Sequence, residues 1–328
     1  MWKAITCEVQ GRGHIKAGVP CQDKTKKLSK NDIDVICLSD GAGSAKFSHY
    51  GAQCIVECAS EYIVDNFQKL IAPNDGRQIK VKILDYLRQK LIERAVELEC
   101  AIEDLASTLL LVAISMNKYL IIHIGDGVIG YIDKEDLKIA SLPDNGEFAN
   151  TTTFVSSKNA LSSMRLFKGN IKEIAGFILM SDGVEQSLYS KPTKSLAQGT
   201  VKLLRGTCIL PSTLMQSLLE NLLKSLFSQY TQDDCSIAIL ARPTPHLLSF
   251  AGFELLELAE LFGISRIAKN TKKRIYRYKK IIEFLATPKT LGQISVEMRI
   301  KPKYLKKYLK KLIDSGFLKN IQAFYSKA

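Results

Sequence analysis

Acidic residues stand at the ends of apolar runs at four places in this 328-residue chain. The segments VICLSDGAGS, YLIIHIGDGVIGYI and GFILMSDGVEQ each end an apolar run in an Asp-Gly pair, at Asp40, Asp126 and Asp182. In QDDCSIAILA, Asp233 and Asp234 directly precede such a run. One Asp-Gly pair after a strand usually marks a hairpin turn, because glycine tolerates positive φ and aspartate hydrogen-bonds its own backbone. Four acidic strand ends in one chain need a common explanation.

A metal site would explain these carboxylates. Converging carboxylates repel each other by roughly 4 kcal/mol per pair at about 4 Å and an effective dielectric near 20. A cluster of them is therefore stable only if cations lie between the carboxylates. Mg²⁺ and Mn²⁺ suit such oxygen ligands. If the strand ends meet at one edge of a sandwich, they can hold two ions bridged by a water that becomes a hydroxide nucleophile. The glycine after Asp40 would then let a backbone carbonyl join the metal shell, as a bulkier residue would not.

The bulk composition favours a protein with a sizeable core. Apolar residues make up 46% of the chain, and the mean hydropathy is near zero. No basic start followed by an apolar segment opens the sequence, and no apolar run reaches membrane-spanning length, so we expect a cytoplasmic protein without a membrane partner. The eight cysteines show no CxxC pair and no histidines at zinc spacing, which predicts reduced thiols. Cys54 and Cys58 could hold half a metal site, but core packing is the favoured interpretation.

The order of the elements favours an α+β fold. The apolar patterns predict strands at 2–9 and 33–39, helices at 48–71 and 78–103, several strands between 107 and 183, a helix at 213–229 and a strand at 235–241. Strands and helix pairs in this order do not alternate as βαβα, so we expect a layered sandwich rather than a parallel sheet. We place an enzyme-like domain at 1–242, a linker and connecting helix at 243–273, and a basic domain at 274–328, because two prolines mark the segment RPTPHLLSF.

Most of the positive charge lies in the C-terminal part. Residues 266–328 hold 18 Lys and Arg against three acids, a net +15, whereas residues 1–265 hold 28 against 30. The pattern after 274 predicts three helices and a short extended tail, an order typical of a winged helix-turn-helix. In the last helix an apolar stripe is surrounded by lysines, which makes nucleic acid or an acidic protein the candidate partner. The candidate nucleic-acid-binding residues are Lys303, Lys306, Lys307, Lys310 and Lys311.

Six motifs in order resemble the metal-dependent Ser/Thr protein phosphatases of the 2C type, over residues 1 to about 242. They are CQD at 21–23, LSDGAGS at 38–44, STLLLVAI at 107–114, HIGDGVIGYI at 123–132, LMSDGVEQ at 179–186 and DDCSIAIL at 233–240. The resemblance implies an αββα sandwich of two antiparallel sheets with helix pairs outside. It also implies hydrolysis of phosphoserine or phosphothreonine by a metal-bridged hydroxide, with two Mn²⁺ or Mg²⁺ ions and a third, weaker one. The partners implied are a phosphorylated protein and a cognate Ser/Thr kinase.

The resemblance also implies roles for individual residues. Asp40 would bridge the metals, with Gly41 contributing its carbonyl and Asp182 and Asp233 their carboxylates. Asp126 matches the position linked to the third ion. The carboxylate of the first motif is Asp23.

Two departures from the common family pattern stand out. The arginine that clamps the substrate phosphate is replaced by Gly18, although Arg12, His14 and Lys16 lie nearby and make Arg12 and His14 the candidate phosphate-binding residues. A histidine suspected of protonating the leaving oxygen is replaced by Ala42, which leaves His14 as the candidate catalytic acid. Both changes resemble a bacterial branch of the family. The alternative is a DNA-binding regulator whose phosphatase-like body is an inactive sensor or scaffold.

Overall fold

The protein forms two compact units in a computed structural model. The structure describes residues 2–133, 136–144, 152–242, 254–264, 267–285, 287–314, 317–321 and 324–327. The first unit comprises Met1–Leu204 with Leu218–Arg242, and the second comprises Arg205–Ser217 with Pro243–Ala328. The N-terminal part of the expected linker, 243–253, lies outside the described residues. The domain boundaries proposed from the sequence therefore stay a prediction.

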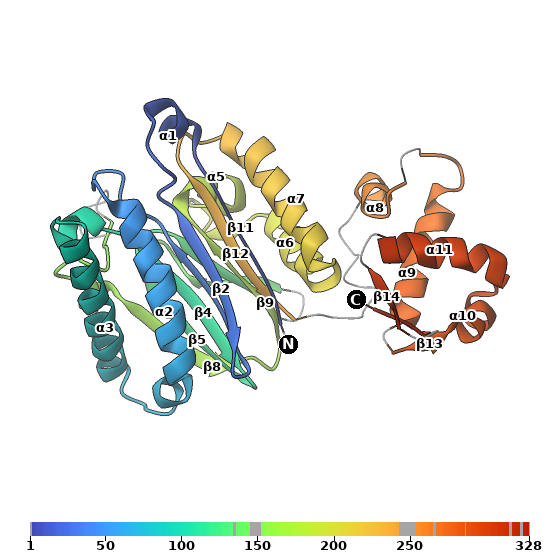
Figure 1. The fold of residues 1–328 in the computed structure, drawn as a ribbon, viewed down its shortest axis with the longest axis horizontal. Helices are drawn as coiled ribbons and strands as arrows, with labels where there is room; N and C mark the ends of the chain where they lie inside the picture. Colours follow the sequence, from blue (N-terminus) through green and yellow to red (C-terminus); the bar gives the residue numbers. More distant parts are fainter. Residues whose placement is uncertain are drawn as a thin grey trace. The chain divides into compact units, whose positions relative to one another are not determined.

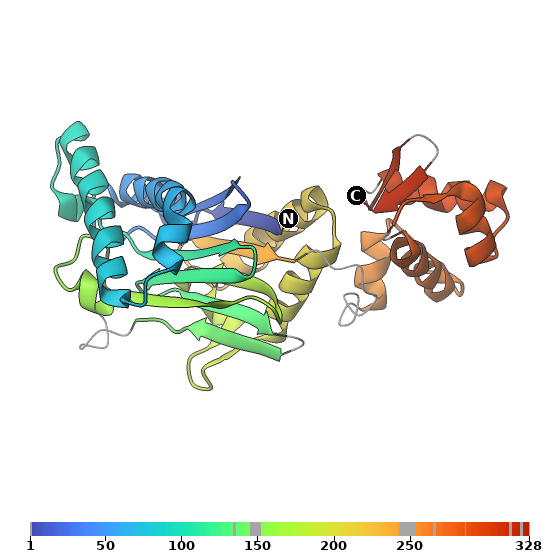
Figure 2. The same cartoon turned by 90° about the horizontal axis from the view of Figure 1, so that it is seen from below.

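Two five-stranded antiparallel sheets form the centre of the first unit. One sheet has the order β1 (Lys3–Val9), β12 (Cys235–Ala241), β9 (Ile174–Met180), β6 (Val128–Asp133) and β7 (Asp136–Ser141). The other has the order β2 (Lys24–Lys30), β3 (Ile33–Ser39), β4 (Leu109–Ser115), β5 (Lys118–Ile124) and β8 (Arg165–Asn170). The two sheets lie face to face, as Figure 2 shows.

Alternation along the central strands explains why they are apolar throughout. On β3, Ile36 and Leu38 face the core between the sheets, whereas Val35 and Cys37 face the core beneath the helices. Successive side chains of a strand point to opposite faces, so a sheet covered on both sides needs apolar residues at every position. The continuous apolar runs in the sequence are therefore strands of a buried sheet.

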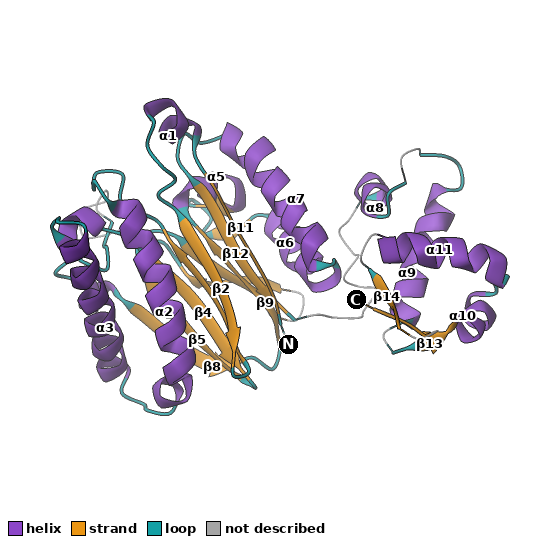
Figure 3. Cartoon of the chain, viewed as in Figure 1, coloured by secondary structure: helices purple, strands orange, loops and turns teal. Residues whose placement is uncertain are grey.

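Helices cover the outer faces of both sheets. The long helices α2 (Ser48–Ile71) and α3 (Gly76–Glu97) pack on the sheet that contains β3. The first part of α6 (Gln198–Ile209) and the last part of α7 (Ser212–Ser225) belong to the same unit and flank the other sheet (Figures 1 and 3). On that side Leu204 of α6 lies over Gly176 of β9. The αββα sandwich expected from the sequence is confirmed. None of the described helices is long and apolar enough to cross a membrane.

Shorter elements complete the first unit. They are α1 (Arg12–Ala17), η1 (Ile102–Leu105), α4 (Ala160–Ser163), α5 (Asp182–Leu188), β10 (Tyr189–Ser190), β11 (Ser195–Leu196) and η2 (Phe227–Gln229). The sequence pattern did not reveal β2, whose residues KTKKLSK carry little apolar signal. It lies at a sheet edge, where lysines protect a strand from pairing with other chains.

The second unit contains both helices and strands. In chain order these are α8 (Leu255–Leu261), α9 (Thr271–Phe284), β13 (Lys289–Thr290), α10 (Leu291–Met298), α11 (Pro302–Asp314), β14 (Leu318–Ile321) and β15 (Phe324–Lys327). The strands form a small antiparallel sheet in the order β13, β15, β14. The three expected helices are present, and the extended tail belongs to this sheet. The winged-helix interpretation stays a prediction.

A buried histidine makes the first unit sensitive to acid. His123 on β5 is 1% exposed, and its Nδ1 lies 2.6 Å from the Ser141 hydroxyl. Burial, helped by the charge of Arg165, lowers the pKa of His123 from 6.5 to about 3. Below pH 6.5 the unfolded chain therefore binds a proton that the folded chain does not, so stability falls as the pH falls towards 3.

We expect His123→Gln to remove this loss. At about 1.4 kcal/mol per pH unit, the wild type should lose about 2 to 3 kcal/mol more unfolding free energy between pH 6.5 and 4.5 than the variant does. Urea unfolding at several pH values measures how the unfolding free energy of each protein changes with pH. A packing cost of the substitution that is the same at every pH does not affect this comparison. If the unfolding free energies of the two proteins fell equally with pH, His123 would not be the cause of the acid sensitivity.

Candidate active site

The acidic strand ends lie at one end of the sandwich. Asp23 precedes β2 and Asp40 follows β3, and the pairing of Lys24 with Ser39 puts these ends at the same edge. In the other sheet, Met180 of β9 pairs with both Val128 of β6 and Ile237 of β12. The residues that flank those strand ends are therefore also neighbours. They are Asp126, Asp182, Asp233 and Asp234.

Electrostatic interaction confirms that these carboxylates converge. The pKa of Asp40 is raised well above its usual value, first by burial and then by the negative charges of four other carboxylates. These four belong to Asp23, Asp182, Asp126 and Asp233. All five acidic residues expected at a metal site are thus brought together, and we call them the carboxylate cluster.

The carboxylate cluster has buried oxygens without partners. Burial, with the charges of Asp126 and Asp233, raises the pKa of Asp182 to about 6 against the effect of a hydrogen bond with Asp40. Burial is also the main reason why the pKa of Asp23 is raised to about 7. Among the described residues, Asp23 Oδ2 and Asp182 Oδ1 have no hydrogen-bond partner. Because buried carboxylate oxygens are costly when unpaired, this donor set fits divalent cations that prefer oxygen ligands.

Close packing explains the glycine after two of the aspartates. Neither Gly41 nor Gly183 is among the residues with positive φ. A Cβ on Gly183 would lie 1.8 Å from the Asp234 carbonyl oxygen, and one on Gly41 would lie 2.9 Å from Ser48. These two Asp-Gly pairs are not hairpin turns, since β3 is followed by α2 and β9 by α5. The absence of a side chain on each glycine lets a neighbouring segment lie close to the aspartate.

Thr108 and Ala106 hold the backbone on the two sides of Gly41. The Asp40 N–H donates to Thr108 Oγ1 at 2.8 Å, and the Thr108 N–H donates to the Asp40 carbonyl at 2.8 Å. The next bond joins the Ala42 N–H to the Ala106 carbonyl at 2.9 Å. Neither of these two backbone hydrogen bonds uses the Gly41 carbonyl oxygen. That oxygen is therefore suited to the role of metal ligand expected for it.

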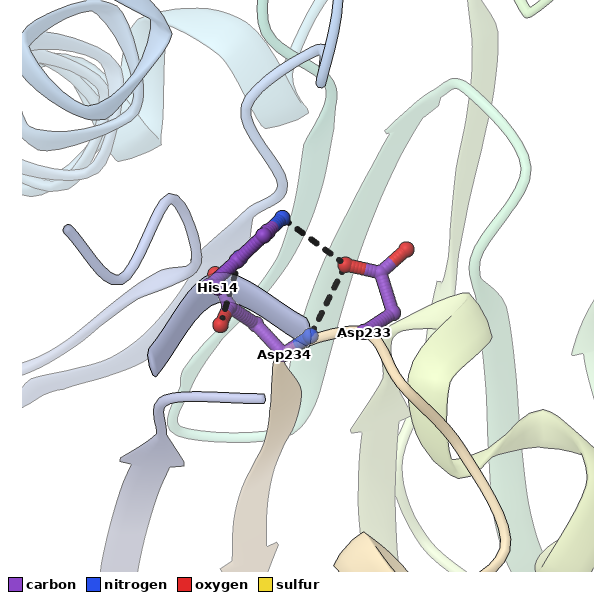
Figure 4. A group of neighbouring side chains, drawn as sticks. All are labelled: His14, Asp233 and Asp234. Carbon is purple, nitrogen blue, oxygen red and sulfur yellow. Dashed lines mark hydrogen bonds and ion pairs between the residues drawn. The ribbon is translucent and has the colours of Figure 1, made fainter. Parts of the chain in front are cut away.

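Asp234 ties three segments together, a role that the sequence interpretation did not assign to it. Its carboxylate accepts the Gly11 N–H at 2.6 Å and the Gln22 N–H at 2.5 Å. His14 Nδ1 lies 2.9 Å from the same carboxylate without the alignment of a hydrogen bond, and His14 Nε2 lies 3.8 Å from Asp233 (Figure 4). These three side chains could themselves hold a cation. The only sequence signal was the doubled aspartate before a strand.

The other candidate residues have different surroundings. The Arg12 guanidinium donates to the carbonyls of Gln229, at 2.7 Å, and Thr231, at 3.4 Å, so its described contacts are carbonyls. Its role as a phosphate-binding residue stays a prediction. Ala42 packs with two other alanines and Phe154, so no side chain at this position can donate a proton.

Thr152 is a contact of the cluster that the sequence did not indicate. Its hydroxyl donates to Asp126 Oδ2 at 2.5 Å. The segment that carries it is held by Arg88, whose Nε donates to the Val155 carbonyl at 3.2 Å, and by the Val155 N–H, which donates to Ser107. No motif marks Thr152, because its proximity to Asp126 arises only from the fold.

Comparison with known proteins agrees with this geometry. Serine/threonine-protein phosphatase 3 of Escherichia coli K12 is 28% identical over 193 residues, which cover 56% of this chain and 74% of that protein. A crystal structure of a bacterial serine phosphatase has a TM-score of 0.54 at 14% identity, covering 74% of this chain and 98% of that one. The serine/threonine phosphatase Stp1 from Staphylococcus aureus gives 0.51 at 14% identity, with coverages of 74% and 95%.

These two solved structures share the fold of the first unit. A family model described as protein phosphatase 2C matches residues 10–223, which is more than half of the chain. The match contains four of the five residues of the carboxylate cluster, Asp23, Asp40, Asp126 and Asp182. The chain therefore belongs to the protein phosphatase 2C family.

Proposed function

We propose that the chain is a metal-dependent protein serine/threonine phosphatase that hydrolyses phosphoserine and phosphothreonine. The observation that carries the proposal is the carboxylate cluster, with two buried oxygens that have no partner among the described residues. The substrate would be a protein phosphorylated by a Ser/Thr kinase. No disulfide joins any of the eight cysteines, all of which lie among the described residues, as a reducing cytoplasm would keep them.

The ligands would come from both sheets. Asp23, Asp40, Asp182 and Asp233, with the Gly41 carbonyl, would hold two Mn²⁺ or Mg²⁺ ions, and Asp126 a third. When bound, such ions supply charge neutralisation at the phosphate oxygens and an acidified water.

The remaining groups orient and support these ligands. Thr108 holds the backbone of Asp40, and Asp234 holds the segments that precede His14 and Asp23. His14 lies beside Asp233 and Asp234, where it can contact the phosphate or give a proton to the leaving oxygen. Since catalysis of this kind depends mainly on positioning, small displacements of these groups should be costly.

We expect Asp40→Asn and Asp182→Asn to lower the rate of phosphopeptide hydrolysis at least about 100-fold, because each removes a charge that the cations require. Hydrolysis by the wild type should need added Mn²⁺ or Mg²⁺ and should stop in chelator. Asp65→Asn is the matched control, since Asp65 is exposed and pairs only with Lys30 among the described ion pairs. Equal rates with metal and with chelator would favour the inactive-scaffold alternative.

We propose a second function, nucleic-acid binding, for the second unit. Helix α11 buries Leu305, Leu309 and Leu312. At 100° per residue, the exposed residues Lys303, Lys306, Lys307 and Lys310 fall within one stripe of about 100° on the opposite face. Lys311 differs from these four, because its ammonium donates to the Gly263 carbonyl.

The lysine stripe suits the phosphate backbone of DNA. Helices α10 and α11 are joined by the short turn at 299–301, and in a helix-turn-helix the second helix enters the major groove. Lysines that contact phosphates supply affinity without reading the sequence. An acidic protein is the competing partner for the same charges.

We expect the full chain to bind duplex DNA with a slope of about −4 in log affinity against log salt, since each phosphate contact contributes about −0.9. Replacing Lys306 and Lys310 together with methionine should flatten the slope by about two. The control replaces Lys272 and Lys273, which are exposed on α9, with methionine, so that the same charge is removed. Fluorescence anisotropy at several salt concentrations measures the slopes. Absence of binding at low salt would assign the stripe to an acidic protein.

A further inference from the structure

An ion pair between a buried glutamate and an exposed lysine lies at the edge of the carboxylate cluster and has no part in the chemistry described so far. Glu185 is three residues after Asp182 on α5, so the two side chains lie on the same side of this helix. The Glu185 side chain is only 5% exposed, and its Oε2 lies 2.9 Å from Lys191 Nζ. Glu185 Oε1 has no hydrogen-bond partner among the described residues. A carboxylate this deeply buried is stabilised only if a cation stays beside it.

Glu185 therefore fixes the position of an otherwise flexible lysine. Lys191 begins the turn between β10 and β11, and its side chain is 70% exposed. An ammonium group has three N–H donors, of which the ion pair with Glu185 uses one. No other described residue accepts from this ammonium, so the other two donors are available to an oxygen-rich ligand that reaches the site from solvent.

The charges near Lys191 indicate that the ligand of its ammonium is a phosphate group. The Glu185 hydrogen bond is the main cause of the raised pKa of Lys191, and the charges of Asp182 and Asp126 add to it. Lys191 thus lies within electrostatic reach of two members of the carboxylate cluster. A phosphate dianion that approaches these carboxylates is repelled, and a fixed cation at their edge reduces the repulsion.

We propose that Lys191 is a substrate-binding residue that donates to the phosphate group of the phosphoprotein, and that Glu185 is the residue that positions it. The inference rests on the proposed phosphatase function and specifies how the same site recognises its substrate. Inorganic phosphate, the product, carries the same group and should bind to the same ammonium.

The test compares full-length Lys191→Met with full-length Lys194→Met. Lys194 lies in the same turn, is exposed and loses the same charge on substitution. Isothermal titration of inorganic phosphate into the Mn²⁺-loaded chain should show about tenfold weaker binding for Lys191→Met and unchanged binding for Lys194→Met, as for the loss of one charge-assisted hydrogen bond. The KM for a phosphopeptide should rise by a similar factor with kcat within about threefold, because ground and transition states lose the contact equally. Lys191→Arg should restore most of the affinity.

Different results separate this inference from the function on which it rests. Equal phosphate affinity in the two methionine variants would overturn the role of Lys191, and a lower melting temperature of Lys191→Met alone would then identify the ion pair as purely structural. If the wild type shows no metal-dependent hydrolysis, the phosphatase proposal fails. The phosphate titration would still decide whether Lys191 binds the anion.

Discussion

Repulsion among converging carboxylates is the constraint on which the rest of this structure depends. Five of them meet at one end of the sandwich, and the raised pKa values of Asp23, Asp40 and Asp182 measure how unfavourable their charged forms are without cations. Such an arrangement persists only where the surrounding fold holds it in place. The sandwich does so with two sheets whose central strands are buried on both faces. Bound cations would convert the repulsion into stabilisation.

Individual contacts also hold the carboxylates in place. Gly183 allows the start of α5 to lie against the backbone of Asp234, and Thr108 fixes the backbone of Asp40 with two hydrogen bonds. Asp234 joins the segments that carry His14 and Asp23 to the start of β12. The backbone that carries the cluster is thus held by hydrogen bonds to Thr108 and Asp234. Lys191, held by Glu185, would add a cation on the solvent side.

The sequence predicted those parts of the structure that depend on local pattern. Helix α2 and strand β3 have the expected bounds, because their apolar spacing is regular and they are flanked by turn residues. Strand β2 was missed, since an edge strand with four lysines lacks an apolar pattern. The convergence of the carboxylates was predictable because each stands at a strand end. The contacts of Thr152 with Asp126 and of Lys191 with Glu185 were not, because they join residues whose proximity only the fold creates.

The central claim is that the carboxylate cluster binds divalent cations, and counting bound Mn²⁺ tests it most directly. Electron paramagnetic resonance of free Mn²⁺, during titration of the metal-stripped full-length chain, gives the number of ions bound. We predict at least two ions per chain in the wild type and a loss of tight binding in Asp40→Asn. Binding of no Mn²⁺ by the folded wild type, or equal binding by Asp40→Asn, would contradict the account.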